Sequence, residues 1–439
     1  MISGNQREAD RPLVAKRLFR WAHKAVLAVV DQGLISGSNF VLGVLLARWL
    51  PAQEYGAYAI AFAIFLLVSL LYQALISEPM TVFGASTFRQ ELRDYLRKLL
   101  RLHAAVSVVI IASLGLAALV THLWSPHSRL VPALMAVSIA SPCILLFWLA
   151  RRAHYLQART AGAAAGAAVY CLLVFGLVVL VNRVVGLSTS RAFFVLAGAA
   201  LLTSVFLFAS LESMPSAGQV TFGETWRRHW AYGRWALAGA VATWVPANMF
   251  YPLLGGAGGM SQAAEFKALM NFVLPVGQIA AALALLMQPH AARVFHQKGY
   301  AAVHDLTRSL VWMYPAGATV YWIVIMVLAH RIVPLLYGGN YPGVVSLIPW
   351  LAVGSVLQTA TYASAVGLRA MHAPFSVFQA YGIASVVVFL VGVPAAIMFG
   401  VPGAVAGFVI GNGTAMALAY RLVLRHTSET LGQLARQEG

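Results

Sequence analysis

Residues 55–80 read YGAYAIAFAIFLLVSLLYQALISEPM, and no charged side chain occurs between Glu54 and Glu78. About 20 apolar residues are enough for an α-helix to cross the hydrocarbon core of a bilayer. Eleven further stretches of this kind occur in the chain, at 25–48, 99–121, 130–150, 161–181, 192–211, 235–254, 266–287, 309–330, 344–368, 376–398 and 402–421. The sequence therefore predicts an all-α polytopic membrane protein with about 12 transmembrane helices.

Composition agrees with this prediction. The chain has 439 residues, of which 60% are hydrophobic and only 10% are charged. A soluble domain of this size needs more charge on its surface. Six basic residues precede the first span, but no short apolar core with a small-residue cleavage site follows them. We therefore predict no cleavable signal peptide.

The distribution of basic residues indicates topology rather than nucleic-acid binding, although the net charge is +17. If the N-terminus lies inside, 24 Lys and Arg residues fall in cytoplasmic segments. The other side holds six, which are Arg48, Arg129, Arg183, Arg191, Lys267 and Arg331. This bias is the positive-inside pattern, with contacts to anionic lipids as a further role for the charges. It predicts a multi-pass protein with both termini in the cytoplasm and no nucleic-acid partner.

A weak repeat divides the chain into two halves. Asp94, Arg97 and Leu99 align with Asp305, Arg308 and Leu310 at one offset of 211 residues. The repeat predicts two pseudo-symmetric six-helix lobes related by an axis along the membrane normal, with a substrate site between them. The predicted parts are a basic N-terminus at 1–24, lobes at 25–211 and 235–421, a linker at 212–234 and a tail at 422–439.

Metal and enzyme sites are not expected. Cys143 and Cys171 lie within spans, and the twelve histidines show no ligand spacing. The predicted outer loops are short and hold no paired carboxylates, whereas a membrane glycosyltransferase or polymerase needs catalytic side chains on a sizeable outer loop. We therefore predict a protein that is not an enzyme and has neither a bound metal nor a cofactor.

Two acidic residues within or near spans are candidates for ion coupling, because an acid in hydrocarbon is costly and usually faces a cavity or a partner. Asp31 interrupts the first span, where it either pairs with a nearby Arg or Lys or faces a cavity as a proton-coupling carboxylate. Glu78 precedes the helix-bending Pro79, and it is either a hinge contact or a solvated end.

Three residues are candidates for substrate binding. Arg48 ends the first span, where it either pairs with Glu54 or contacts an anionic head group, for which its two-pronged guanidinium is suited. Asn39 is a polar residue of the same span. Lys267 is one of the few outer cations and follows the glycine run at 255–259, which we expect to be a flexible outer loop.

Glycines and aromatics add expectations about packing. Glycines four residues apart permit close helix contact, and they occur as Gly33 and Gly37 in the first span and as Gly403, Gly407 and Gly411 in the last. Before the seventh span, Trp226, Trp230 and Trp235 alternate with arginines, which fits a helix at the membrane surface.

The junction LLARWLPAQEYGAYAIA (45–61) resembles the first-to-second span junction of the Wzx-type polysaccharide flippases. These belong to the multidrug/oligosaccharidyl-lipid/polysaccharide exporter superfamily. IVPLLYGGNYPGVVSLIPWLAV (332–353), GLRAMHAP (367–374) and FGVPGAVAG (399–407) are similar to later junctions of the same family. Two departures are a missing glycine before Pro51 and ANMFYPLL (247–254) in place of the usual Asp-Arg pair late in span seven.

The resemblance implies a bacterial inner-membrane translocator of glycans linked to undecaprenyl diphosphate, used in O-antigen, capsule or exopolysaccharide assembly. It implies alternating access driven by an ion gradient, and it adds membrane lipids, a polysaccharide polymerase and chain-length machinery as partners. The alternatives are a cation-coupled multidrug exporter of the same superfamily, for which buried acids are few, and a membrane polymerase or glycosyltransferase.

Overall fold

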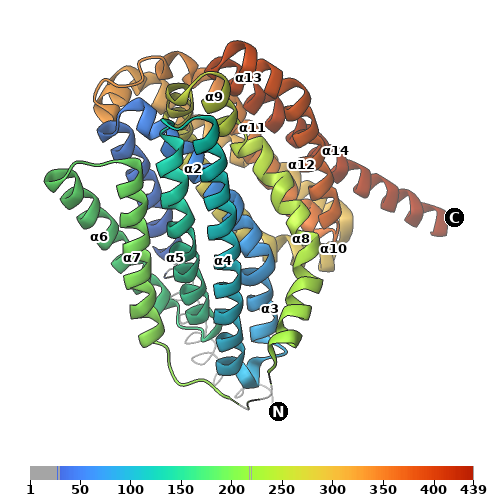
Figure 1. The fold of residues 1–439 in the computed structure, drawn as a ribbon. Coiled ribbons are helices and arrows are strands. Elements are labelled where there is room, and N and C mark those ends of the chain that lie inside the picture. Colours follow the sequence, from blue (N-terminus) through green and yellow to red (C-terminus); the bar gives the residue numbers. More distant parts are fainter. Residues whose placement is uncertain (1–26, 28–29, 217, 219, 439) are drawn as a thin grey trace, which may run out of the picture. The chain divides into compact units, whose positions relative to one another are not determined.

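The computed structural model describes residue 27 and residues 30–438, apart from 217 and 219. The predicted basic N-terminus at 1–24 lies outside these residues. Every regular element in the described chain is helical, as the coiled ribbons of Figure 1 show. The first helix runs over Val30–Trp49. It is followed by α2 (Ala52–Tyr72), η1 (Gln73–Ser77), α3 (Glu78–Ala85), η2 (Arg89–Glu91), α4 (Leu92–Trp124), α5 (Leu130–Leu156), α6 (Thr160–Val184), α7 (Thr189–Ala209), α8 (Phe222–Asn248), α9 (Phe250–Ala257), α10 (Met260–Tyr337), α11 (Val344–Ala370), α12 (Pro374–Val387), η3 (Val388–Gly392), α13 (Val393–Phe399) and α14 (Val401–Glu438).

The helices agree with the predicted spans. Among the described residues, ten helical stretches are long and apolar enough to cross a membrane, and α8 and α9 add an eleventh as a pair bent by 49°. This number is lower than the predicted 12 partly because α10, with 78 residues, covers two predicted spans. A straight helix of that length would measure about 120 Å, several times the thickness of a bilayer. Gly299 interrupts it with φ 73° and ψ −164°, so α10 is two consecutive helices.

Two π-turns lie within spans, and each is followed closely by a proline. The first, η1, joins α2 to α3, and Pro79 is the second residue of α3. The second, η3, joins α12 to α13, and Pro394 is the second residue of α13. A proline has no N–H for the carbonyl four residues before it, so regular α-helical bonding is interrupted at both places.

The chain divides into two compact units. Unit one comprises the described residues of 1–39, 72–116 and 138–233, and unit two comprises 40–71, 117–137 and the described residues from 234 onward. The chain therefore passes between the units within helices, as at 71/72 in α2 and 233/234 in α8. The two six-helix lobes at 25–211 and 235–421 remain a prediction.

Only one of the two predicted glycine stripes makes close helix contacts. In α14, a Cβ at Gly403 would lie 1.9 Å from the Ala395 carbonyl oxygen, and one at Gly407 would lie 2.5 Å from the Phe250 ring. The stripe of the first helix is different, because a Cβ at Gly33 or Gly37 would meet nothing within 4 Å. The close contact that these two glycines permit is therefore not made within the part of the chain that the structure describes.

The glycine run is more helical than expected, and the aromatic segment is helical as expected. Gly255 to Ala257 form the last turn of α9, and the chain turns at Gly259, whose φ is 88°. The flexible outer loop predicted over 255–259 is thus largely helix. The segment with Trp226 and Trp230 is the first half of α8, which continues to Asn248 as one helix in Figure 1. The two indole rings stack with centroids 5.6 Å apart.

Candidate functional site

Lys267 lies inside unit two, held between aromatic rings. It is the eighth residue of α10, and only 6% of its surface is exposed. Its Nζ lies 5.1 Å from the ring centroid of Phe62 on α2 and 5.8 Å from that of Tyr251 on α9. The ion pairs among the described residues give Lys267 no carboxylate partner. Ring faces attract a cation, by about 2 kcal/mol when it is desolvated, so the aromatic rings compensate its charge only in part.

A buried polar network lies one helical turn further along α10. The Asn271 amide Nδ2 donates to the Tyr55 hydroxyl at 3.0 Å and to the Tyr337 hydroxyl at 3.5 Å. Tyr55 donates in turn to the Gly43 carbonyl at 3.0 Å, and Tyr337 donates to the Ala268 carbonyl at 2.8 Å. The amide oxygen of Asn271 is buried without a hydrogen-bond partner. Lys267 and Asn271 are therefore a buried cation and an unpaired acceptor on one face of α10.

In unit one, Asp31 is neutralised by a partner from α5. Arg151 donates to both carboxylate oxygens, with distances of 3.2 Å from Nε and 2.5 Å from Nη2, and the Tyr155 hydroxyl donates at 2.5 Å. Asp31 is 1% exposed, so the ion pair is buried. The alternative in which Asp31 pairs with an arginine is thus what the structure contains. The arginine comes from α5, about 120 residues away in the sequence.

Glu78 lies near Arg152, the residue that follows Arg151 on α5. Its side chain is exposed, and its carboxylate interacts electrostatically with Arg152. Arg152 also donates to the Thr81 hydroxyl at 3.1 Å. The two acids predicted for ion coupling therefore interact with consecutive arginines of α5, whose positions in the sequence indicate only topology.

The predicted substrate-binding residues of the first helix do not join Lys267. Arg48 is exposed and donates to the Leu335 carbonyl at 2.9 Å, at the C-terminal end of α10. Glu54, the partner considered for Arg48, forms its ion pair with Arg129 at 3.3 Å. Asn39 is exposed. Whether Arg48 and Asn39 contact a substrate stays a prediction.

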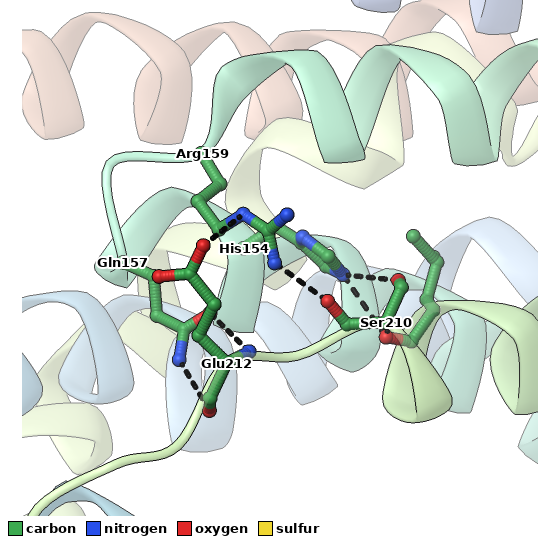
Figure 2. Close-up of polar contacts among 6 residues, drawn as sticks. His154, Gln157, Arg159, Ser210 and Glu212 are labelled. Carbon is green, nitrogen blue, oxygen red and sulfur yellow. Dashed lines mark hydrogen bonds and ion pairs between the residues drawn. The ribbon is translucent and has the colours of Figure 1, made fainter.

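A further polar cluster ties together the ends of α5, α6 and α7. Figure 2 shows His154, Gln157, Arg159, Ser210 and Glu212 turned toward one another. Arg159 donates to the Ser210 carbonyl at 2.6 Å and pairs with the Glu212 carboxylate at 3.3 Å. The Gln157 side-chain amide donates to the Glu212 carbonyl at 3.1 Å and accepts from the Glu212 backbone N–H at 3.3 Å. The buried His154 ring contacts the Leu207 carbonyl at 3.0 Å. These contacts hold the segment after α7 against the turn between α5 and α6.

The described residues include a pocket of moderate size, and they include no cluster suited to a metal. The pocket has a volume of about 350 Å³ and lies in unit two between the end of α9, the start of α10 and the turn before α14. Glu265 and Gln262 are its polar lining, and Ile397 to Phe399 its apolar wall. No group of three His, Cys, Asp or Glu side chains in the described chain is arranged to hold a metal ion.

Comparison with known proteins extends the description of the fold. No known protein family matches the sequence, and no curated protein matches it. The chain is similar in structure to an inward-facing multidrug resistance MATE family transporter of the MOP superfamily, with TM-score 0.74, 14% identity and coverage of 92% of this chain and 98% of that one. It is also similar to the lipid II flippase MurJ in an inward closed conformation, with TM-score 0.66, 12% identity and coverage of 93% and 87%.

A third similar structure is a MOP superfamily transporter from Pyrococcus furiosus, for which a binding pocket of reversed polarity suggests a different function. Its TM-score is 0.64, with 12% identity and coverage of 92% of this chain and 94% of that one. At such identities the similarity establishes the fold. The protein is an all-α membrane protein with the helical fold of these transporters.

Proposed function

We propose that the protein is a flippase that moves a glycan linked to undecaprenyl diphosphate across the bacterial inner membrane by alternating access. The observation that supports this is the buried charge. Asp31, Asp94 and Lys267 are the fully buried charged side chains of the described chain. Asp31 is paired with Arg151, and Asp94 accepts hydrogen bonds from Ser216 and Gly218, so Lys267 is the unpaired one.

An unpaired buried cation favours an anionic cargo. A diphosphate in a low-dielectric interior needs a compensating positive charge, and Lys binds phosphate as a point charge. A cationic drug at Lys267 would meet like charge, which is destabilising. The similarity to the lipid II flippase MurJ supports a lipid-linked cargo. We propose O-antigen, capsule or exopolysaccharide assembly as the pathway, with a polymerase and chain-length machinery as partners.

The multidrug alternative rests on a specific observation. The MATE transporter has a TM-score of 0.74 to this chain, against 0.66 for MurJ, and aromatic rings such as Phe62 and Tyr251 are typical of sites for organic cations. Reconstituted protein decides between the two. Movement of a lipid-linked oligosaccharide without export of a cationic drug supports the flippase, and the reverse result overturns it.

A charge series at Lys267 tests the site. We expect Lys267→Arg to retain part of the transport, Lys267→Gln to lose about tenfold or more, and Lys267→Glu to abolish it, because each step weakens the attraction for a diphosphate. The control is Arg331→Gln, which removes an exposed cation of the same helix pair. Membrane abundance is measured in parallel. If Lys267→Glu transported as well as the wild type, Lys267 would not contact the cargo.

Coupling to an ion gradient remains assigned to Asp31 and Glu78 as part of this proposal. Arg151 and Tyr155 already bond the Asp31 carboxylate, so a coupling ion that binds there has to displace these contacts. Coupling at Asp31 would therefore act by release of Arg151.

A further inference from the structure

The π-turn η1 joins α2 to α3, and the proline that follows it leaves one backbone carbonyl without its usual donor. Pro79 cannot donate to the carbonyl four residues before it, which is that of Leu75. A buried carbonyl left without a donor costs about 1–3 kcal/mol. The proline therefore removes the usual α-helical donor of this carbonyl, and a donor from another element can take its place.

His229 of α8 supplies that donor. Its Nδ1 lies 2.8 Å from the Leu75 carbonyl oxygen, and its Nε2 lies 2.7 Å from the Tyr95 hydroxyl on α4. A carbonyl can only accept, so Nδ1 carries the hydrogen, and in the neutral ring Nε2 then accepts from Tyr95. Both His229 and Tyr95 are fully buried. The ring thus holds a carbonyl of η1 with one nitrogen and α4 with the other.

Gly233, one turn further along α8, allows the close approach. A Cβ at this position would lie 2.6 Å from the Ala74 carbonyl oxygen and 3.1 Å from the Leu75 Cα. Both obstacles are backbone atoms of η1, which cannot swing aside as a flexible side chain does. The backbone of α8 therefore lies directly against the π-turn.

The contact between α8 and η1 lies next to both positions at which the chain changes from one unit to the other. The chain passes from unit two to unit one between 71 and 72, at the residue before η1. It returns to unit two between 233 and 234, at the glycine that touches η1. The stretch from α2 into η1 and the helix α8 each continue from one unit into the other. They contact each other next to the residues at which the chain changes unit. Tyr72, the first residue of this stretch, is held by a hydrogen bond of 3.0 Å to His103.

We propose that η1 is the point at which the span 52–85 bends, and that His229 and Gly233 are positioning residues that hold α8 on this bend. They act on transport through the helix that they position. The proposal rests on the proposed function only where it concerns the transport cycle, because bending of the span is measured without any cargo.

The bend is tested with spin labels at Gln53→Cys and Val82→Cys, two exposed positions on either side of η1, after Cys143 and Cys171 are replaced by serine. We expect His229→Leu to shift or broaden the distance distribution, and His229→Asn to preserve it, because the Asn amide keeps a donor near the position of Nδ1. The matched control is His154→Leu, which removes another buried histidine bonded to a helix carbonyl. An unchanged distribution in His229→Leu, or the same change in His154→Leu, would overturn the proposal.

Transport measurements test whether the contact of α8 with η1 matters for the transport cycle. In proteoliposomes with equal amounts of folded protein, we expect His229→Leu to reduce transport about tenfold, the factor expected for one unmade buried hydrogen bond. Gly233→Ala should reduce transport as well, because its Cβ would lie 2.6 Å from the Ala74 carbonyl oxygen. His229→Asn should stay within about twofold of the wild type. Wild-type activity in both His229→Leu and Gly233→Ala would overturn the positioning role. A wild type without flippase activity would refute the proposed function, and the label distances would still decide whether the span bends at η1.

Discussion

The Asp31 carboxylate accepts three hydrogen bonds, two from Arg151 and one from Tyr155. Buried ion pairs contribute little net stability, because desolvation offsets the attraction, but removal of one partner leaves an unpaired charge. The side chains of Asp31 and Arg151 are 2% and 12% exposed. Loss of either Asp31 or Arg151 therefore leaves the other as a buried charge without a counter-ion.

We expect Asp31→Asn to destabilise the protein by about 3–5 kcal/mol, because it leaves Arg151 buried without its counter-ion. The double variant Asp31→Asn/Arg151→Gln should recover part of that loss. The measurement is the midpoint of thermal unfolding in detergent. The matched control is Glu54→Gln, whose partner Arg129 has a side chain that is 60% exposed, so we expect a loss of about 1 kcal/mol or less. Equal losses in the two single variants would contradict this expectation.

At the same scale, the sequence pointed to individual residues better than to their partners. Asp31 and Lys267 stood out because charge within an apolar span is costly. Arg151 did not, since it lies in a basic loop-end segment where charges are explained by topology. Asn271 and Tyr55 were missed, because a single amide or phenol in an apolar stretch has no periodic signal. Their network depends on which helices pack together, and this is absent from a single sequence.

At the scale of the helical element, glycine has opposite effects in the first and last helices. We expect Gly403→Ala to destabilise the protein by about 1–3 kcal/mol, because the new Cβ would lie 1.9 Å from the Ala395 carbonyl oxygen. Gly33→Ala is the matched control, since nothing lies within 4 Å of its Cβ. That variant should be neutral or more stable by about 0.5–1 kcal/mol, from helix propensity. Thermal unfolding of the two variants is the measurement, and a larger loss in Gly33→Ala would contradict the packing described for α14.

The start of α8, outside the apolar part of the helix, predicts a pH dependence of stability. Burial lowers the pKa of His229, although the hydrogen bond to the Leu75 carbonyl opposes part of this effect. The unfolded chain therefore binds the proton more readily than the folded one. The contribution to stability is complete above about pH 6.5, the usual pKa of histidine, and falls as the pH decreases from there toward the lower folded pKa, at a rate on the order of 1 kcal/mol per pH unit.

We expect the midpoint of thermal unfolding to fall more between pH 7.5 and pH 5.5 in the wild type than in His229→Asn, which has no titrating ring. The comparison is made within each protein, so a general loss of stability in the variant does not affect it. An identical pH dependence in both proteins would show that His229 is not the group responsible.

Helix boundaries could be predicted closely, and helix irregularities could not. The stretch 344–368 became α11 at 344–370, and 161–181 became α6 at 160–184, because a continuous apolar run has a length set by the bilayer. The π-turns and the break at Gly299 were missed. A glycine or a proline in a span is tolerated in many conformations, and its actual effect depends on neighbours such as His229.

At the scale of the whole molecule, the positive-inside bias predicts both termini in the cytoplasm. We expect His127→Cys, in the predicted outer loop between α4 and α5, to react with a membrane-impermeant maleimide in intact cells. Ser213→Cys, in the predicted cytoplasmic segment between α7 and α8, should react only after permeabilisation. Both positions are exposed, and Cys143 and Cys171 are removed first. Labelling of Ser213→Cys in intact cells would invert the predicted topology.

The repeat of 211 residues is matched in packing but not in polar contacts. Leu99 and Leu310 are both buried, with exposures of 0% and 3%. Asp94 is buried against the segment that follows α7, whereas the Asp305 side chain is 80% exposed beside His304. Apolar positions are constrained by the helix face on which they lie, whereas a surface carboxylate is free to differ between repeats.

The break at Gly299 has a mechanical consequence. An unbroken helix of 78 residues would act as a stiff lever, and any tilt at its first turns would be carried along its whole length. A single residue with φ 73° and no side chain is instead a joint that bears little bending load. The two portions that meet at Gly299 are held against each other, because Tyr337 donates to the Ala268 carbonyl and Asn271 donates to Tyr337. The break therefore turns one long stretch of chain into a hairpin of two paired helices.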